Sequence, residues 1–129
     1  MDSSSDTPHT GRINAALANE IGAYVAEFTG RGATRSRVFV DHDVVVCLLE
    51  GNATKGERNL VAAGKAELVR VQRDALQRAM EPHLVDVVQR LTGRTVRTFL
   101  GGTSTLADSS VKVFVLEPEP AAHAAAAAA

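Results

Sequence analysis

The sequence predicts an α+β fold in which two αββ halves form a four-stranded, mainly antiparallel sheet with helices packed on one face. First, segments with apolar residues at helical spacing alternate with short β-branched segments. Second, the sequence Thr-Gly-Arg occurs at 29–31 and again at 92–94, each time between a helical segment and an extended one. Because each helical segment has one apolar stripe, both are expected to bury it against the same sheet.

The length and composition of the chain fit one globular domain. It has 129 residues, of which 45% are hydrophobic and 22% charged, as in ordinary folded domains. We expect a disordered N-terminal tail at residues 1–10, one folded domain at 11–118 and an Ala-rich, low-complexity tail at 119–129. The formal net charge of -1 makes nucleic acid an unfavourable partner for the molecule as a whole.

The first half is predicted to contain one helix and a β-hairpin. Apolar residues recur at helical spacing over residues 13–28, and Gly30 is typical of a helix C-terminal cap. Two β-branched segments, 38–40 and 44–49, lie on either side of the polar sequence Asp41-His42-Asp43. This pattern predicts two strands joined by a short turn.

The second half is predicted to begin with a long helix. Thr54 and Glu57 have the spacing of a capping box, which starts a helix expected to run to about Met80. Its apolar face is expected to consist of Leu60, Gly64, Leu68, Val71 and Ala75. Pro82 either kinks this helix or begins a second one, because proline lacks the amide hydrogen that a helix interior uses.

The last two strands are predicted at residues 96–100 and 111–116. The segment 101–110 between them contains small and polar residues and is predicted to be a long loop. The resulting sheet has one face without helices. That face is expected to be polar, paired with another subunit or covered by a partner.

Arginines gather at the two helix–strand junctions and are the candidate ligand- or partner-binding residues. Arg31, Arg35 and Arg37 lie at the first junction, and Arg94 and Arg97 at the second. A guanidinium group donates two parallel hydrogen bonds to a phosphate or carboxylate, so the two groups are candidates to converge on one anion. The alternative is that they are solvated arginines at strand starts.

No catalytic or metal-binding pattern is recognisable in the sequence. Cys47 lies in an apolar segment, which predicts a buried thiol rather than a nucleophile. The consecutive side chains of Asp41, His42 and Asp43 do not converge on one ion and are typical of a turn. No pair of histidines has helical ligand spacing. We therefore predict that the protein is not an enzyme and has no metal or other cofactor.

The sequence also bears on location. No apolar stretch approaches the roughly 20 residues that cross a bilayer, and the N-terminus is polar and acidic. We expect a soluble cytoplasmic protein without direct membrane insertion, which is peripheral to a membrane only through a partner.

The segment from Asn14 to Glu117 resembles the MpsC-like family, named for a Na+-translocating, membrane potential-generating system. The resemblance is carried by Phe28-Thr29-Gly30-Arg31-Gly32, Asp43-Val44-Val45-Val46, Leu49-Glu50-Gly51, Thr54 with Glu57 and Leu60, Leu91-Thr92-Gly93-Arg94 with Val96, and Val113-Phe114-Val115-Leu116-Glu117. The chain departs from the family pattern at Ala33, where proline is common, and at Asn52-Ala53, where a more apolar pair is usual.

The resemblance implies a soluble accessory to a membrane system that moves ions or inorganic carbon, with no established catalytic residues. We therefore predict a non-catalytic accessory or regulatory domain that binds other proteins, such as a membrane transport complex. A homodimer that buries the open sheet face is plausible but not required by the sequence.

Two other classes of function stay open. One is a nucleic-acid-binding module that uses the arginines at the junctions. The net charge of -1 and the scarcity of aromatic residues disfavour it, since Phe39, Phe99 and Phe114 are expected in the core. The other is an enzyme that binds an anionic substrate through the same arginines, although the sequence supplies no obvious base or nucleophile.

Overall fold

A computed structural model describes residues 7–118, with side chains from residue 11 onward. Its elements follow one another in the order α1 (Thr7–Thr29), β1 (Arg35–Asp41), β2 (Val44–Glu50), α2 (Lys55–Ala62), α3 (Ala66–Thr92), β3 (Val96–Ser104) and β4 (Ser109–Leu116). The predicted tail at 119–129 and residues 1–6 of the predicted N-terminal tail lie outside the described residues. Helix α1 includes residues 7–10, which were predicted to belong to that tail.

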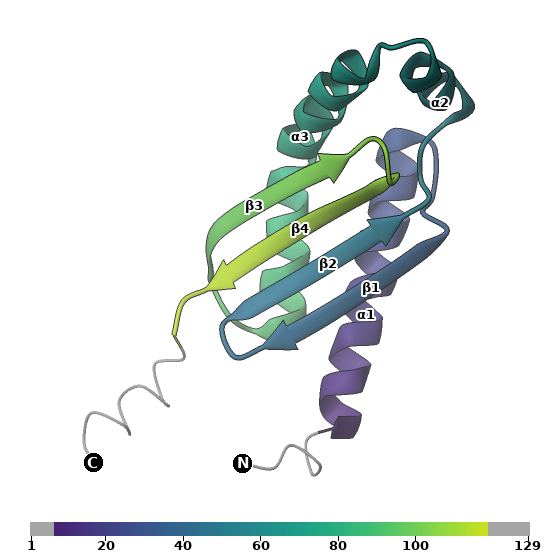
Figure 1. Cartoon of the computed structure of the whole chain (residues 1–129). Coiled ribbons are helices and arrows are strands. Elements are labelled where there is room, and N and C mark those ends of the chain that lie inside the picture. Colours follow the sequence, from purple (N-terminus) through teal and green to yellow (C-terminus); the bar gives the residue numbers. More distant parts are fainter. Residues whose placement is uncertain (1–6, 119–129) are drawn as a thin grey trace, which may run out of the picture.

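The four strands form one antiparallel sheet in the order β1-β2-β4-β3. Helices α1 and α3 lie side by side on one face of it, and α2 lies at one end (Figure 1). Strands β2 and β4 come from different halves and are neighbours at the centre of the sheet. The predicted fold class is confirmed, including the single helix-covered face.

The two halves repeat the same junction in atomic detail. The hydroxyls of Thr29 and Thr92 each donate to the carbonyl four residues earlier, at 2.7 and 2.6 Å. Gly30 and Gly93 follow with φ of +83° and +71°, and each amide donates to the carbonyl four residues before it. Glycine adopts this left-handed conformation at the lowest cost, which explains why a glycine follows the threonine at both helix ends.

The helix predicted from Thr54 to Met80 is broken, and the break lies at Gly64 rather than at Pro82. The capping box of Thr54 and Glu57 is present and starts α2. Gly64 has a φ of +80°, which ends α2, and α3 then runs through Pro82 without interruption. Proline is therefore tolerated inside α3, at the cost of one backbone hydrogen bond.

The break also changes which side chains of the second half are buried. Leu68 and Val71 are 60% and 52% exposed, and Leu60 is exposed on α2, so the predicted apolar face is wrong. Val69 is buried in their place. The prediction assumed one continuous helix. The turn at Gly64 changes the direction of the chain, so the side chains of α3 do not continue the face of α2.

Strand β3 is longer than predicted, and most of the predicted loop 101–110 is sheet. Pairing with β4 continues through Gly101, Gly102, Thr103 and Ser104, leaving only residues 105–108 as the connection. Backbone hydrogen bonds to β4 stabilise this segment. The sequence did not predict this pairing, because its glycines and small polar side chains do not form a hydrophobic pattern.

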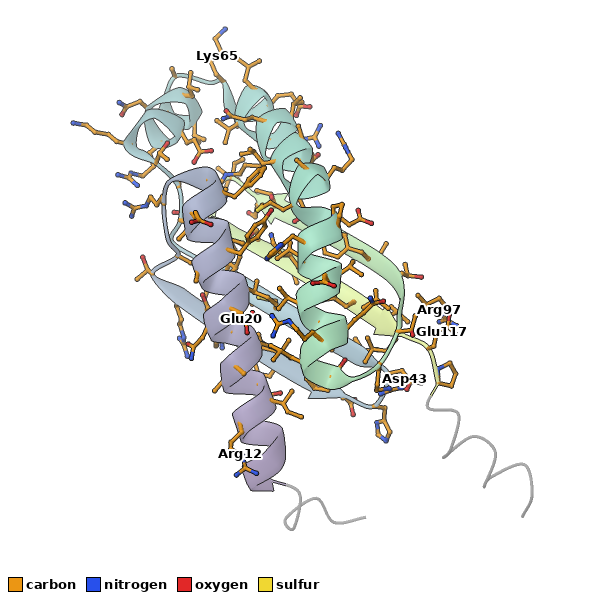
Figure 2. All side chains as sticks on the ribbon, turned by 180° about the vertical axis from the view of Figure 1, so that it is seen from behind. Arg12, Glu20, Asp43, Lys65, Arg97 and Glu117 are labelled. Carbon is orange, nitrogen blue, oxygen red and sulfur yellow. The ribbon has the colours of Figure 1, made fainter. Side chains whose placement is uncertain are left out.

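The apolar core lies between the helices and one face of the sheet. Its fully buried side chains come from α1, α3, β2 and β4 and include Leu17, Ile21, Val45, Leu49, Leu84, Val87, Val88, Phe114 and Leu116. Figure 2 shows the molecule from the helix side, with Glu20 of α1 facing α3, where it pairs with Arg90. The core is aliphatic, as the composition requires.

The centre of the other face of the sheet is apolar as well. Register places on it the open-face residues Val44, Val46, Leu48, Val111, Val113 and Val115 on the central strands, with Phe39 and Leu100 on the edge strands. Phe39 is 52% and Leu100 56% exposed, so the expectation that Phe39 is in the core is wrong. Of the three expectations for this face, a polar surface is contradicted for its centre, while Arg37 and Glu50 lie beside that centre.

Candidate functional site

The register of the sheet keeps the two arginine groups apart. Arg35 pairs with Glu50 at the end of the sheet where α1 stops, and Arg31 lies just before it. Arg97 follows Val96 at the start of β3, which is at the opposite end. Figure 2 shows Arg97 far from the end of the molecule that carries α2. The two groups therefore do not converge on one anion.

Arg94 is held by hydrogen bonds within the fold. Its guanidinium donates to a carboxylate oxygen of Asp43 at 2.6 Å and to the backbone carbonyls of His42 and Glu117 at 2.9 and 2.7 Å. These contacts tie the β1–β2 turn to the end of β4. Both terminal nitrogens of Arg94 are thus bonded within the protein, while its buried Nε has no hydrogen-bond partner among the described residues.

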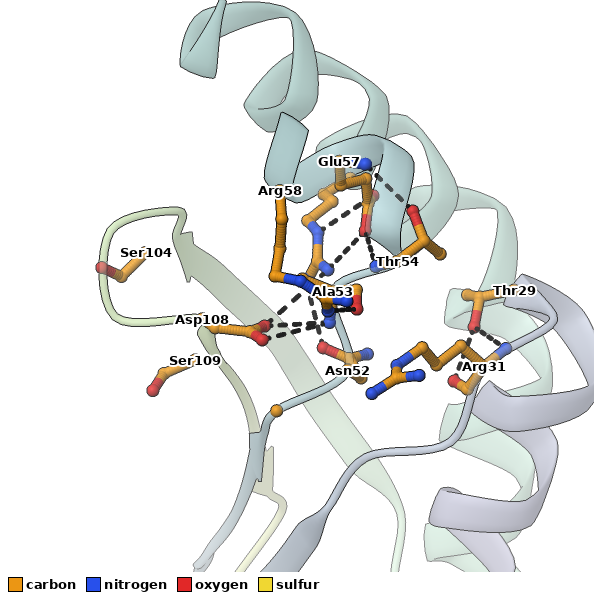
Figure 3. Close-up of polar contacts among 12 residues, drawn as sticks. Thr29, Arg31, Asn52, Ala53, Thr54, Glu57, Arg58, Ser104, Asp108 and Ser109 are labelled. Carbon is orange, nitrogen blue, oxygen red and sulfur yellow. Dashed lines mark hydrogen bonds and ion pairs between the residues drawn. The ribbon is translucent and has the colours of Figure 1, made fainter. Parts of the chain in front are cut away.

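The other four arginines lie on the surface in different settings. Arg37 points to the open face and pairs with Glu50, with 3.3 Å between Nη2 and Oε1. Arg31, Arg35 and Arg97 are exposed and form no ion pair with another described residue. Figure 3 shows Arg31 beside Thr29, whose hydroxyl accepts from the Arg31 amide.

The remaining candidates behave as turn and core residues. Asp41 is the last residue of β1, and His42 and Asp43 form the β1–β2 turn, where His42 has a φ of +53°. Cys47 is fully buried, and this burial raises the pKa of its thiol to about 11. Over residues 11–118, no group of three or more His, Cys, Asp and Glu side chains is placed to hold a metal ion.

A cavity of about 290 Å³ lies at the end of the sheet next to α2, between the sheet and the helices. Its lining mixes apolar side chains with charged and polar ones: Val25, Thr29, Asn52, Thr54, Gly56, Glu57, Leu60, Gln72, Arg73, Leu76, Gln77, Met80, Thr103, Ser110 and Lys112. Gly56, Leu60 and Gln72 are exposed, so the cavity opens to solvent beside α2. We call it the Lys112 cavity.

Lys112 is the unusual residue of this cavity. It lies on β4 facing the helices and is only 3% exposed. Its ammonium donates to Gln77 Oε1 at 3.2 Å, and its nearest strand neighbours in register are Cys47 and Gly101. No carboxylate of the described residues lies within 4.0 Å of it. Burial lowers the pKa of Lys112, and repulsion from Arg73 adds to this.

Gln77 reaches Lys112 because Gly101 leaves it room. A Cβ atom at position 101 would lie 1.9 Å from Gln77 Nε2 and 2.4 Å from its side-chain carbonyl carbon. Any larger residue at position 101 would therefore displace Gln77. The three residues come from α3, β3 and β4 and form one fixed arrangement on the helix-covered face.

Arg73 closes one side of the cavity and is already paired. Its guanidinium donates to both oxygens of Glu57 at 2.8 and 3.3 Å and to Asn52 Oδ1 at 3.1 Å. Burial by itself raises the pKa of Glu57, but hydrogen bonds from Arg73 and Thr54 bring it below its ordinary value. This network joins α3 to α2 and to the loop after β2.

Asp108 extends the network to the β3–β4 connection, as Figure 3 shows. Its carboxylate accepts from the Ala53 amide at 3.0 and 3.2 Å, and its backbone carbonyl accepts from Gly51. Its φ of +50° is uncommon for a residue other than glycine. The loop carrying Asn52 is therefore fastened to two elements that line or flank the cavity.

Sequence reasoning missed Lys112, although a signal was present. In an extended strand, alternate side chains share a face, so Lys112 is in phase with Phe114 and Leu116. A lysine in phase with core residues is rare and indicates a buried charge. The valines of the other phase, at 111, 113 and 115, are equally apolar. The pattern therefore did not reveal which face was covered.

Comparison with known proteins gives one result for this chain. A family model described as "Na+-translocating membrane potential-generating system (MpsC)" matches residues 9–118. No curated protein and no solved structure matches the chain. Within the described residues, none of the helices is sufficiently long and apolar to cross a membrane.

Proposed function

The chain belongs to the MpsC family, and we propose that it is a non-catalytic, cytoplasmic accessory protein of a Na+-translocating membrane system. It acts by protein–protein contact through the open face of its sheet. The observation that supports this proposal is the apolar character of that face, described above. A contiguous apolar surface of this kind typically marks a protein interaction site.

We propose a second copy of this chain as the occupant of the open face. The four strands lie about 4.8 Å apart and the seven residues of β1 span about 3.3 Å each, so the face measures roughly 400 Å² in projection. Two such faces together approach the roughly 1,000 Å² that a specific interface needs. Sheet faces rich in valine also pack well on each other, as the two layers of a β-sandwich do.

The charges at the edge of the open face fit the same arrangement. Arg35 and Asp41 lie at the two ends of β1 and on the same side of the sheet as Phe39. A two-fold axis across the strands would lay β1 antiparallel over the β1 of the second copy. Arg35 of each copy would then face Asp41 of the other, which favours the pairing.

The oligomeric state and the membrane potential test this proposal together. Wild-type protein is expected to sediment as a dimer, and Val113→Lys is expected to shift it to a monomer. In native cells that lack the chain, we expect a smaller Na+-dependent membrane potential. Wild-type protein would restore this potential, whereas Val113→Lys would not.

Leu106→Lys is the matched control, because Leu106 is 91% exposed on the β3–β4 connection and off the open face. It should leave both the dimer and the potential unchanged. A potential that does not depend on the chain would reject the accessory role. A monomeric wild type, or one bound to nucleic acid or to a different protein through Val113, would reject the second copy as the occupant.

A further inference from the structure

We propose that the Lys112 cavity binds a small aliphatic carboxylate, with Lys112 as the partner of its charged group. This inference goes beyond the accessory role and does not depend on the dimer. It rests on a buried cation without a counter-ion, on a polar arrangement built around that cation, and on an apolar wall beside it.

The first observation is that Lys112 lacks charge compensation. An ammonium group has three donors, and the described residues supply one acceptor, the amide oxygen of Gln77. Removing a charge from water is unfavourable unless it is paired. An anionic group in the cavity would supply both the missing charge and the missing acceptors.

The second observation is that the other cationic side chain of the cavity, Arg73, is already paired within the protein. Arg73 is bound on both sides of its guanidinium by Glu57 and Asn52. Its charge is therefore neutralised within the protein, and the network keeps it in place. Lys112 is the charge left for a ligand, so the cavity suits a single negative charge.

The third observation concerns the remaining walls and the size. Val25, Leu76 and Met80 are apolar lining residues, whereas Thr103 and Ser110 offer hydroxyls from the sheet next to Lys112. The cavity has a volume of about 290 Å³, which is roughly the volume that ten water molecules occupy in the liquid. It therefore accepts a compact ligand with a carboxylate at one end and a short aliphatic body at the other.

Propionate is the probe that tests this assignment, with propionamide as its uncharged counterpart. We expect saturation-transfer NMR to show propionate binding to the wild-type chain with a dissociation constant on the order of 1 mM. Propionate should also raise the melting temperature in a concentration-dependent way. Propionamide and sodium chloride of equal ionic strength should do neither.

Two variants connect binding to Lys112. Lys112→Met is expected to lower the propionate signal at least about tenfold, which corresponds to the loss of one charge-assisted contact. Gln77→Glu places a carboxylate beside Lys112 and should abolish propionate binding while the fold stays intact by circular dichroism. Lys65→Met, at an exposed lysine before α3, should leave binding unchanged.

The wild-type measurement alone can overturn the proposal if Lys112→Met fails to fold. Absence of propionate binding up to about 50 mM would contradict it, because one buried charge pair should give a measurable affinity in that range. Equal binding of propionate and propionamide, or binding that persists in Gln77→Glu, would also contradict it. Dimerisation through Val113 is measured separately, so either proposal can fail alone.

Discussion

The two ends of the helix-covered face differ in chemistry although the same helix and strand run through both. At one end, Phe114 and Leu116 of β4 belong to the same core cluster as Leu84 and Val88 of α3, and all four are at most 1% exposed. At the other end, the same two elements place Lys112, Ser110 and Gln77 around a cavity. We call these the apolar end and the polar end.

The difference teaches that stability and binding are separated along one sheet. The apolar end removes hydrocarbon from water, which is the main source of folding free energy. The polar end holds a buried cation and an open volume, both of which reduce stability. Such a combination is typical of a site kept for a ligand.

The largest difference between the two ends should be the loss of unfolding free energy when a side chain is shortened or replaced. Leu84→Ala removes buried hydrocarbon at the apolar end and is expected to lower the free energy of unfolding by about 3 kcal/mol. Thr103→Val at the polar end should change it by less than about 1 kcal/mol, because Thr103 lines open space. Urea unfolding measures both. Equal losses would show that the cavity end is as tightly packed as the core.

Removing Arg73 should break the network that fastens α2 to the polar end. Arg73→Met removes the donor to Asn52 Oδ1 and leaves the carboxylate of Glu57 with the Thr54 amide as its donor, so we expect a loss of about 2 kcal/mol and faster amide exchange in α2. Arg70→Met is the control, since Arg70 forms only exposed ion pairs within α3. If α2 exchanges at the same rate in both variants, the network does not hold it.

The fall of the free energy of unfolding at acid pH should depend on the same network. The pKa of Glu57 is lowered in the folded chain, so its contribution is present above the ordinary value of 4.5 and is lost as the pH falls through the folded value. Glu57→Gln should remove about 1 kcal/mol near neutral pH, after allowance for solvent screening, and flatten the decline below pH 4.5. Stability measured in urea between neutral and acid pH checks this. A decline as steep as that of the wild type would contradict it.

Much of the fold was predictable from the sequence, whereas the Lys112 cavity was not. Helical spacing, the hairpin turn and the Thr-Gly-Arg junctions reflect local chemistry and predicted the class of fold. The break at Gly64 was missed because apolar spacing continues across it, and the length of β3 because its outer half lacks apolar side chains.

The candidate site depended on contacts that local patterns do not contain. Lys112, Gln77 and Arg73 come together only through strand pairing and helix packing. The arginines singled out in the sequence lie at opposite ends of the sheet because β2 pairs with β4, so that β1 and β3 run in opposite directions. No motif in the sequence indicates this strand order. Arg31, Arg35 and Arg97 stay candidates for contact with a partner, since they are exposed.

The most direct test of the difference between the two ends is the stability of Lys112→Met in a buffer without carboxylates. Methionine has a similar length and no charge, so the free energy of urea unfolding should rise by about 1 kcal/mol relative to wild type. Lys65→Met should leave it unchanged. A loss of about 1 kcal/mol or more in Lys112→Met would mean that the buried lysine stabilises the fold, and would contradict its role as a charge kept for a ligand.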